Sequence, residues 1–393
     1  MLKDSLLQFE VQQFIKENSE RNITTVALEK NPFPLFSWNA ILNQIAARQK
    51  AKDKLPTWFA ASEILFPSKI SVEQTSSEQT AAYKSTLISG TNIIDLTGGF
   101  GVDDYYFSKV FSEVVHCEMN SELSEIVKHN FEKLQCKNIR CVEGNSLTIL
   151  KSLNAKFDWI YVDPSRRNEN KGKVFMLKDC LPNVPELLDF YFEYSDSILI
   201  KTAPLLDLTA GLMELKNVKK IHIVAVENEV KELLWELSKD FDGTIAIKTT
   251  NIKKDKNEIF DFEWNQFRGT INFGLPKKYL YEPNSAIMKS GGFNEISQHF
   301  QIDKLHPHSQ LYTSDSLLDF PGRVFEIQQA FPFQRKEMKA ILEGKKANIT
   351  TRNFPESVEE LRKKWKIKEG GALYCFFTTD VNNHKIVLIC TKI

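Results

Sequence analysis

The sequence predicts an α/β protein built around a Rossmann-like sheet of mainly parallel strands. Between residues 86 and 278, short β-branched apolar runs alternate with amphipathic helical stretches, which is the order that βαβ units produce. A glycine-rich turn follows the first run, and polar residues stand at the ends of the next three. The apolar runs are Asn92–Leu96, Glu113–His116, Ile139–Val142, Trp159–Val162, Ser197–Ile200, Ile221–Val226 and Thr244–Lys248.

Two further regions flank this central one, so we expect three domains. Residues 1–85 carry apolar positions at helical spacing in 8–20 and 38–50, which predicts an N-terminal helical domain. Residues 86–278 form the sheet domain. In residues 279–393, the order strand, helix, strand, helix, strand, strand from Arg323 onward predicts an α+β domain of the ferredoxin-like type.

The composition is that of a globular cytoplasmic protein. Hydrophobic residues make up 42% of the chain and charged residues 26%, and no apolar run is long enough for a membrane span. Six scattered cysteines without a CxxC pair predict reduced thiols. His306 and His308 have the spacing of metal ligands but no further ligand nearby in the sequence, so we expect no metal site.

Charge is balanced overall but not locally. The chain holds 51 basic and 51 acidic residues, whereas residues 335–368 hold 11 basic and 5 acidic ones. A local basic excess on a neutral protein favours a polyanionic partner. A solvated helix face is the other interpretation of such a run.

The glycine turn is the strongest local signal for a ligand site. Asp95 ends the first strand, and a turn containing Gly98, Gly99 and Gly101 follows before a helix begins near Asp103. A dinucleotide site would have a third glycine near position 104, where this chain has aspartate. The Asp95 carboxylate suits a ligand with a cationic amino group. A tight turn that binds nothing is the alternative.

The next three strand ends carry polar residues as well. Glu118 lies 23 residues beyond Asp95, where a carboxylate can accept hydrogen bonds from both hydroxyls of a ribose. Asn145 follows the third strand and can face an adenine edge. Asp163 follows the fourth. Each residue alone could belong to a surface loop, but together they predict a nucleoside-containing ligand.

Residues 92–167 resemble class I methyltransferases that use S-adenosylmethionine. Asp95–Gly101, including Thr97, is similar to their first motif, and Asp163-Pro164 to their fourth. The resemblance implies that Glu118 binds the ribose and Asn145 the adenine side of the cofactor. Two positions depart from the family pattern, because many members have glycine at Thr97 and aspartate at Asn145.

The chain resembles one subgroup more closely, the bacterial methyltransferases with a THUMP-like C-terminal domain. THUMP domains of related enzymes bind RNA, so the resemblance implies a tRNA or rRNA substrate, with residues 279–393 as the THUMP-like unit. It rests on segments 73–83, 95–103, 163–167, 201–207, 281–284, 305–307 and 320–325.

Catalysis is expected at the fourth strand end. Asp163 and the Pro164 carbonyl can accept hydrogen bonds from an exocyclic amine and raise its nucleophilicity. Ser165 and Arg166 stand where base-amine methylases have other residues, including a stacking aromatic, which argues against that chemistry. The predicted RNA contacts are Arg166, Arg167, Lys201, Lys363, Lys364 and Lys366.

The sequence thus predicts a methyltransferase that uses S-adenosylmethionine and acts on RNA. Two alternatives stay open at this point. One is an enzyme that methylates a protein or a small molecule. The other is a catalytically silent nucleic-acid-binding protein that has retained the fold.

Overall fold

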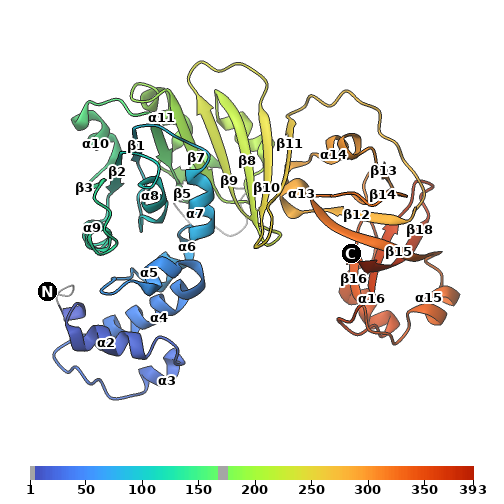
Figure 1. The fold of residues 1–393 in the computed structure, drawn as a ribbon, viewed down its shortest axis with the longest axis horizontal. Coiled ribbons are helices and arrows are strands. Elements are labelled where there is room, and N and C mark those ends of the chain that lie inside the picture. Colours follow the sequence, from blue (N-terminus) through green and yellow to red (C-terminus); the bar gives the residue numbers. More distant parts are fainter. Residues whose placement is uncertain (1–4, 167–175) are drawn as a thin grey trace. The chain divides into compact units, whose positions relative to one another are not determined.

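The computed structural model describes residues 5–166 and 176–393. The chain folds as two compact units, the first formed by Met1–Lys219 and Leu233–Gly243, the second by Lys220–Glu232 and Thr244–Ile393 (Figure 1). None of the described helices has the length and apolar character needed to span a membrane.

The chain begins with a helical region, as expected. The pattern of Trp38, Ile41 and Ile45 makes one face of the longest helix apolar, and Ser37 caps that helix by accepting a hydrogen bond from the amide of Ala40. Ile41 and Ile45 pack with Val11 and Ile15 in a small core. The helices are α2 (Phe9–Glu17), α3 (Ile23–Ala27), α4 (Trp38–Lys54), α5 (Pro56–Ala60), α6 (Lys69–Gln74) and α7 (Glu78–Ser85).

A sheet follows in the first unit, with the order β9-β7-β4-β1-β2-β3, and the second unit contributes strands in the order β11-β10-β8. Strands β3, β2, β1, β4 and β7 are parallel neighbours, so the prediction of a Rossmann-like sheet is confirmed. The strands are β1 (Asn92–Asp95), β2 (Glu113–Glu118), β3 (Ile139–Glu143), β4 (Trp159–Val162), β7 (Ser197–Thr202), β8 (Val218–Val226), β9 (Glu229–Ser238), β10 (Ala246–Ile252) and β11 (Glu258–Glu263).

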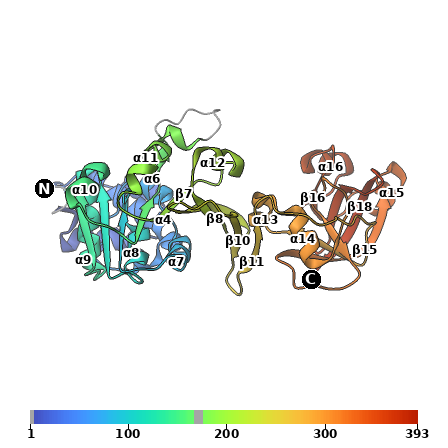
Figure 2. The same cartoon turned by 90° about the horizontal axis from the view of Figure 1, so that it is seen from above.

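Helices cover both faces of this sheet. Figure 2 shows α8 and α9 on one face and α10, α11 and α12 on the other. Right-handed crossovers between parallel strands produce this arrangement and bring the strand ends that carry polar residues to one edge. The helices are α8 (Val102–Phe107), α9 (Ser121–Lys133), α10 (Ser146–Leu153), α11 (Val184–Tyr191) and α12 (Leu208–Glu214).

Strand β9 was not expected from the sequence. Residues 229–238 contain helix-forming Glu, Lys and Leu, yet they form a strand antiparallel to β7 with a nearly continuous buried run. Glu227 and Asn228 both have positive φ, which is the backbone of a tight hairpin turn between β8 and β9. Tertiary burial of Leu233, Leu234 and Trp235 outweighs local helix propensity here.

The second unit holds a seven-stranded sheet with the order β13-β14-β12-β15-β18-β17-β16. Its last six elements follow the predicted order of strand, helix, strand, helix, strand, strand. The strands are β12 (Tyr279–Pro283), β13 (Asp303–Lys304), β14 (Tyr312–Ser314), β15 (Gly322–Pro332), β16 (Asn348–Thr351), β17 (Tyr374–Thr379) and β18 (Lys385–Lys392). The helices are α13 (Ser285–Ser290), α14 (Phe293–Phe300), α15 (Arg335–Ile341) and α16 (Val358–Trp365). The predicted domain limits at 85/86 and 278/279 stay predictions.

Candidate active site at the sheet edge

The glycine turn lies between β1 and α8, and two buried rings pack against it. A Cβ atom on Gly98 would lie 2.2 Å from Cε1 of His116, and one on Gly101 would lie 2.4 Å from Cζ of Phe131. Gly99 and Gly101 also have positive φ, of 55° and 74°. A larger residue at 98 or 101 therefore collides with a buried ring, whereas a Cβ at Gly99 would meet only the carbonyl of Thr97, at 3.6 Å.

Asp95 is buried at the start of this turn. Its Oδ1 accepts hydrogen bonds from the amide and hydroxyl of Thr97, at 2.7 and 3.0 Å, and the residue is buried. Burial, followed by the charge of Asp104, raises the pKa of Asp95 well above its ordinary value. The structure thus gives Asp95 a part in holding the turn.

Glu118 joins the turn to the end of β2. Its Oε2 accepts a hydrogen bond from the amide of Gly99 at 3.0 Å, and its Oε1 accepts one from the amide of Asn120 at 2.7 Å. The next residue, Met119, is a large apolar side chain that is 62% exposed. Met119 was not predicted as a site residue from the sequence, although an apolar residue directly after the acid at a strand end is visible there.

Asn145 caps the helix that follows β3. Its Oδ1 accepts hydrogen bonds from the amides of Leu147 and Thr148, at 3.1 and 3.3 Å. Gly144 before it has a φ of 134°. These bonds use the side-chain oxygen of Asn145 and not its NH₂, so a contact of the NH₂ with an adenine stays a prediction.

The fourth strand end brings together residues that are distant in the sequence. The amide of Asp163 donates to the hydroxyl of Thr97 at 2.7 Å, which ties this strand end to the glycine turn. Lys201, at the end of β7, places its Nζ 2.5 Å from Oδ2 of Asp163. Lys201 was expected to contact phosphate, and here it is engaged with the candidate catalytic carboxylate.

The structure describes residues 164–166 of the predicted motif that follows the fourth strand. Pro164 is buried and Ser165 is exposed. Ser165 and Arg166 form the short strand β5 (Ser165–Arg166), which pairs with β6 (Cys180–Leu181) after the 3-10 turn η1 (Leu177–Asp179). Arg167 lies outside the described residues. The roles of Arg166 and Arg167 at phosphate therefore stay predictions.

A buried polar cluster supports the site from α7 and α8. Asp103 accepts hydrogen bonds from the hydroxyls of Ser76 and Tyr161, both at 2.9 Å, and its Oδ1 lies 3.2 Å from Nζ of Lys84. Burial opposes ionisation, but Lys84, Lys201 and these hydrogen bonds hold the pKa of Asp103 below its ordinary value. This cluster was not predicted from the sequence, because its members are separated by up to 85 residues.

A buried pair, His116 and Asp104, lies next to the glycine turn on the side of Gly98. Nδ1 of His116 is 2.6 Å from Oδ2 of Asp104, and both side chains are fully buried. Burial lowers the pKa of the imidazole, and burial together with Asp103 raises that of Asp104 well above its usual range. This pair connects α8 to β2, and thus connects the two elements that carry the glycine turn and Glu118.

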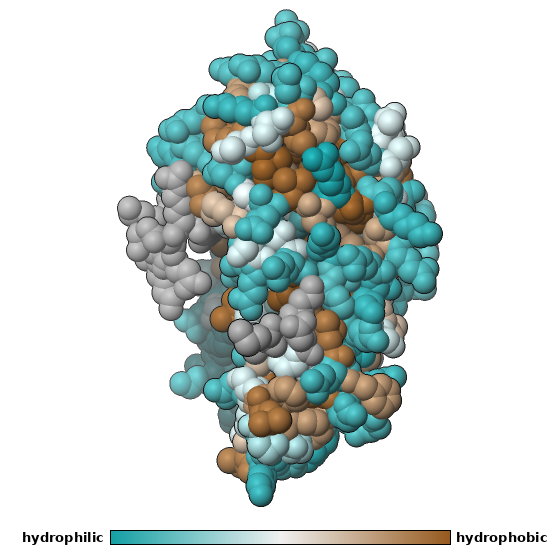
Figure 3. Space-filling model, turned by 90° about the vertical axis from the view of Figure 1, so that its left-hand side faces the viewer, coloured by the Kyte–Doolittle hydropathy of each residue, from teal (hydrophilic) through white to brown (hydrophobic). Residues whose placement is uncertain are grey.

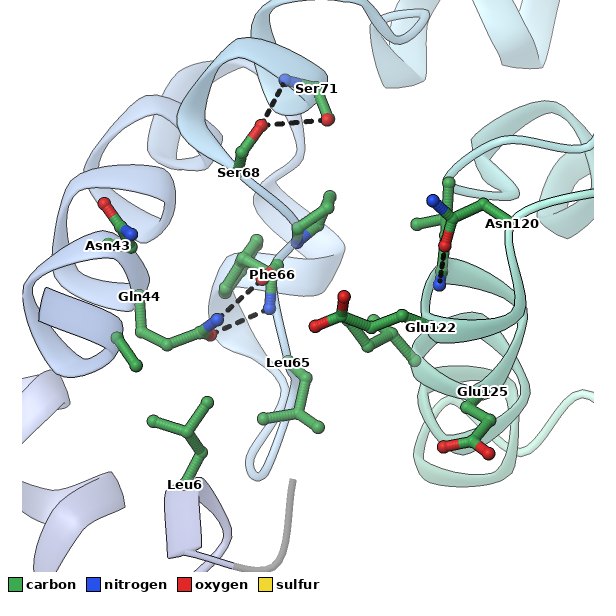
Figure 4. A pocket seen from close by; sticks show the side chains of 14 residues that line it. Leu6, Asn43, Gln44, Leu65, Phe66, Ser68, Ser71, Asn120, Glu122 and Glu125 are labelled. Atoms are coloured by element: carbon green, nitrogen blue, oxygen red, sulfur yellow. Dashed lines mark hydrogen bonds between the residues drawn. The ribbon is translucent and has the colours of Figure 1, made fainter. Parts of the chain in front are cut away.

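A cavity of about 600 Å³ lies near the end of β2, between α9 and the N-terminal helices. Figure 4 shows Asn120, Glu122 and Glu125 on one side and Gln44, Ser68 and Ser71 on the other. The side-chain amide of Gln44 already has hydrogen-bond partners, because it bonds both the carbonyl and the amide of Phe66.

Within the described parts of the chain, no cluster of three or more metal-ligating side chains exists.

The side of the molecule that carries α9, α10 and β3 is mostly hydrophilic. Figure 3 shows that apolar side chains on this face gather in separate patches with hydrophilic residues around them. Among the described residues visible on this face, the apolar side chains form no single continuous surface.

The predicted basic helix lies in the second unit. Lys363, Lys364 and Lys366 are exposed on and just after α16. Nζ of Lys364 lies 3.0 Å from a carboxylate oxygen of Glu356, so one of the three charges is partly neutralised. A role of these lysines at RNA stays a prediction.

Comparison with protein families finds two matches in the second unit. A model described as a ferredoxin-like domain matches residues 279–321, and one described as THUMP domain-like matches residues 322–392. The search of curated proteins finds no match.

Among solved structures, a candidate methyltransferase from Porphyromonas gingivalis W83 matches over the whole length. It is 31% identical, the match covers 100% of this chain and 99% of the other, and the TM-score is 0.88. TrmK of M. capricolum, solved with S-adenosyl-homocysteine, is 15% identical, with 41% of this chain and 68% of the other covered and a TM-score of 0.33. An rRNA methylase from Streptococcus thermophilus is 10% identical, with 41% and 94% covered and a TM-score of 0.30.

Proposed function

Because this chain belongs to the family of class I methyltransferases with a THUMP-like C-terminal domain, to which the P. gingivalis protein also belongs, we propose that it transfers a methyl group from S-adenosylmethionine to RNA. The observation that carries the proposal is the edge formed by the glycine turn, Glu118 and Asp163, in a chain that also has a THUMP-like domain.

The residues at this edge fit the methyl donor. Each carboxylate oxygen of Glu118 accepts one hydrogen bond from a backbone amide. Each can accept a further hydrogen bond, which leaves acceptors for the two ribose hydroxyls. Gly99 leaves the backbone open on the ligand side, and exposed Met119 offers an apolar contact for a nucleobase. When bound, the donor supplies a methyl group on a positively charged sulfur, and the protein orients it.

Asp163 is the group that faces the methyl acceptor. Lys201 bonds one carboxylate oxygen, Oδ2, which fixes the side chain and leaves Oδ1 to accept a hydrogen bond from the acceptor. An acceptor held this way is oriented toward the donor and gains electron density at the attacking atom. Lys201 acts through Asp163 in this arrangement and is therefore a positioning residue.

RNA is favoured as the acceptor by the second unit. Its THUMP-like part carries the exposed lysines of α16, which can contact phosphates without reading sequence. An enzyme of this kind acts where cellular RNA is accessible, and we therefore keep the cytoplasm as its expected location.

The proposal is tested by comparing modified nucleosides in tRNA and rRNA from three strains by mass spectrometry. One strain lacks the protein, one is complemented with the parent chain, and one is complemented with Asp163→Ala. We expect one methylated nucleoside to disappear without the protein, to return with the parent and to stay absent with the variant. Titration of purified Asp163→Ala with S-adenosyl-homocysteine should show nearly unchanged affinity, because Asp163 faces the acceptor.

An unchanged nucleoside profile in all three strains, with donor binding intact, overturns the choice of RNA. The protein or small-molecule acceptor then takes its place. Failure of the parent protein to bind S-adenosylmethionine or its product overturns the assignment as an active enzyme.

A further inference from the structure

Two arginines in the second unit share one buried carboxylate. Glu282 on β12 is buried and is the cross-strand partner of Arg323 on β15. Nε of Arg323 donates to Oε2 of Glu282 at 2.6 Å, and Nη2 of Arg352 donates to Oε1 at 2.8 Å. Each carboxylate oxygen thus binds one guanidinium group, and the two groups are brought next to each other from β15 and from the end of β16.

The cluster carries an excess positive charge at the surface. One carboxylate neutralises one guanidinium, so the three side chains sum to +1. Each arginine side chain is 36% exposed, while that of Glu282 is 3% exposed. Arginine has five N–H donors, and the contacts of each arginine with Glu282 use only some of them. Nε of Arg352 is buried and has no hydrogen-bond partner among the described residues.

Neutralising Glu282 does not by itself need two guanidinium groups. A buried carboxylate is compensated by a single well-placed guanidinium, and a second one adds desolvation cost without further neutralisation. Here the second arginine adds N–H donors beside those of the first, on a side chain that is partly exposed to solvent. An anion with several acceptor oxygens would use those donors and balance the extra charge.

We propose that Arg323 and Arg352 form a binding site for a backbone phosphate of RNA. The proposal rests on the proposed function, since it takes RNA to be the substrate. Planar guanidinium groups match the oxygens of a phosphate with paired hydrogen bonds, and Glu282 fixes them beforehand so that little side-chain freedom is lost on binding. The lysines of α16 offer point charges on longer and more mobile stems.

The test measures binding of fluorescently labelled bulk tRNA over a salt series for four single variants. Arg323→Gln and Arg352→Gln each leave one guanidinium on Glu282, so the fold is retained. We expect each to raise Kd roughly tenfold at low salt and to flatten the salt slope by about one unit or less. Lys256→Gln is the matched control, because it removes one charge from an exposed pair with Asp319 in the same unit.

Glu282→Gln separates positioning from simple charge. It makes the protein more positive, so general electrostatic attraction predicts tighter RNA binding, whereas the proposed site predicts weaker binding because the guanidinium groups lose their anchor. Thermal unfolding is followed for each variant to confirm folding.

If both arginine variants bind tRNA as Lys256→Gln does while the parent binds well, the arginine site is wrong and the RNA function stands. If the parent shows no binding even at low salt, the RNA function itself fails, and this site fails with it.

Discussion

At the residue scale, Glu118 combines an observed structural role with a predicted role in cofactor binding. It accepts hydrogen bonds from the amides of Gly99 and Asn120, and it is the predicted acceptor for ribose hydroxyls. A single carboxylate thus links the glycine turn to the β2 end, and it is predicted to bind the cofactor as well. This combination explains why an acid, and not an amide, suits the position: all of its contacts are hydrogen-bond donors.

Replacing Glu118 with alanine should weaken donor binding. The loss of a charge-assisted hydrogen bond is worth about 1.5–3 kcal/mol, so affinity for S-adenosyl-homocysteine should fall by roughly tenfold to a hundredfold. Isothermal titration of the parent and the variant measures the change. Glu122→Ala, on the exposed first turn of α9, serves as the control and should bind like the parent. Parent-like affinity in Glu118→Ala would remove the ribose assignment.

The contact of Lys201 with Asp163 indicates a different role from the one predicted for this lysine. A lysine after a strand end was interpreted as a phosphate contact, but its ammonium group lies on Asp163 and the side chain is 14% exposed. A cation held by a carboxylate has less attraction to spare for RNA. Its position favours a role in orienting Asp163.

At the scale of elements, the glycine turn depends on the rings beneath it. His116 from β2 and Phe131 from α9 fill the space where Cβ atoms of Gly98 and Gly101 would stand. Asp104 on α8 holds His116 in place. The turn, β2 and α8 are therefore one packed assembly, and a change in any of them is expected to move the backbone that is predicted to bind the cofactor.

Gly101→Ala tests this assembly against a matched glycine. Gly101 and Gly344 both have a φ of 74°, so alanine adds similar backbone strain of roughly 1–2 kcal/mol at either site. A Cβ at Gly344 meets nothing within 4 Å, whereas at Gly101 it collides with Phe131. We expect Gly101→Ala to lose about 1–3 kcal/mol more stability than Gly344→Ala in urea unfolding, and also to lose donor affinity.

Gly344→Ala should keep the donor affinity of the parent, because Gly344 lies in the second unit. Equal stability and equal donor affinity in the two variants would show that the packing beneath the turn has no influence on cofactor binding.

At the scale of the whole molecule, chemistry and substrate capture are predicted to reside in different parts of the chain. The candidate catalytic edge belongs to the first unit, and the basic segment 335–368 belongs to the second. A chain with zero net charge has little general attraction for RNA, so local basic groups must supply it.

Replacing Lys363, Lys364 and Lys366 together with alanine should therefore weaken RNA binding. The salt slope should flatten by about one unit or less for each lost phosphate contact. Because Glu356 already neutralises part of Lys364, the triple variant should lose less than three full contacts. Affinity for S-adenosyl-homocysteine should stay at the parent value. Unchanged RNA binding would exclude α16 as the RNA-facing surface.

The sequence by itself determined the fold class and the elements of the predicted cofactor edge. The α/β class, the parallel strands and the resemblance to class I methyltransferases with a THUMP-like domain are confirmed. These features can be predicted from the sequence because they are local. The strand that leads into Gly98-Gly99 and the acid at the end of the next strand lie within about 25 residues of each other. The roles of the individual site residues stay predictions.

Only the tertiary structure decided which distant side chains meet. It placed Lys201 on Asp163, His116 on Asp104, and Arg352 on Glu282, pairs separated by 38, 12 and 70 residues. It also turned residues 229–238 into a buried strand against their local helix propensity. The physical reason is the same in each case: these contacts depend on burial and strand order, which arise when the whole sheet forms and which no short segment specifies.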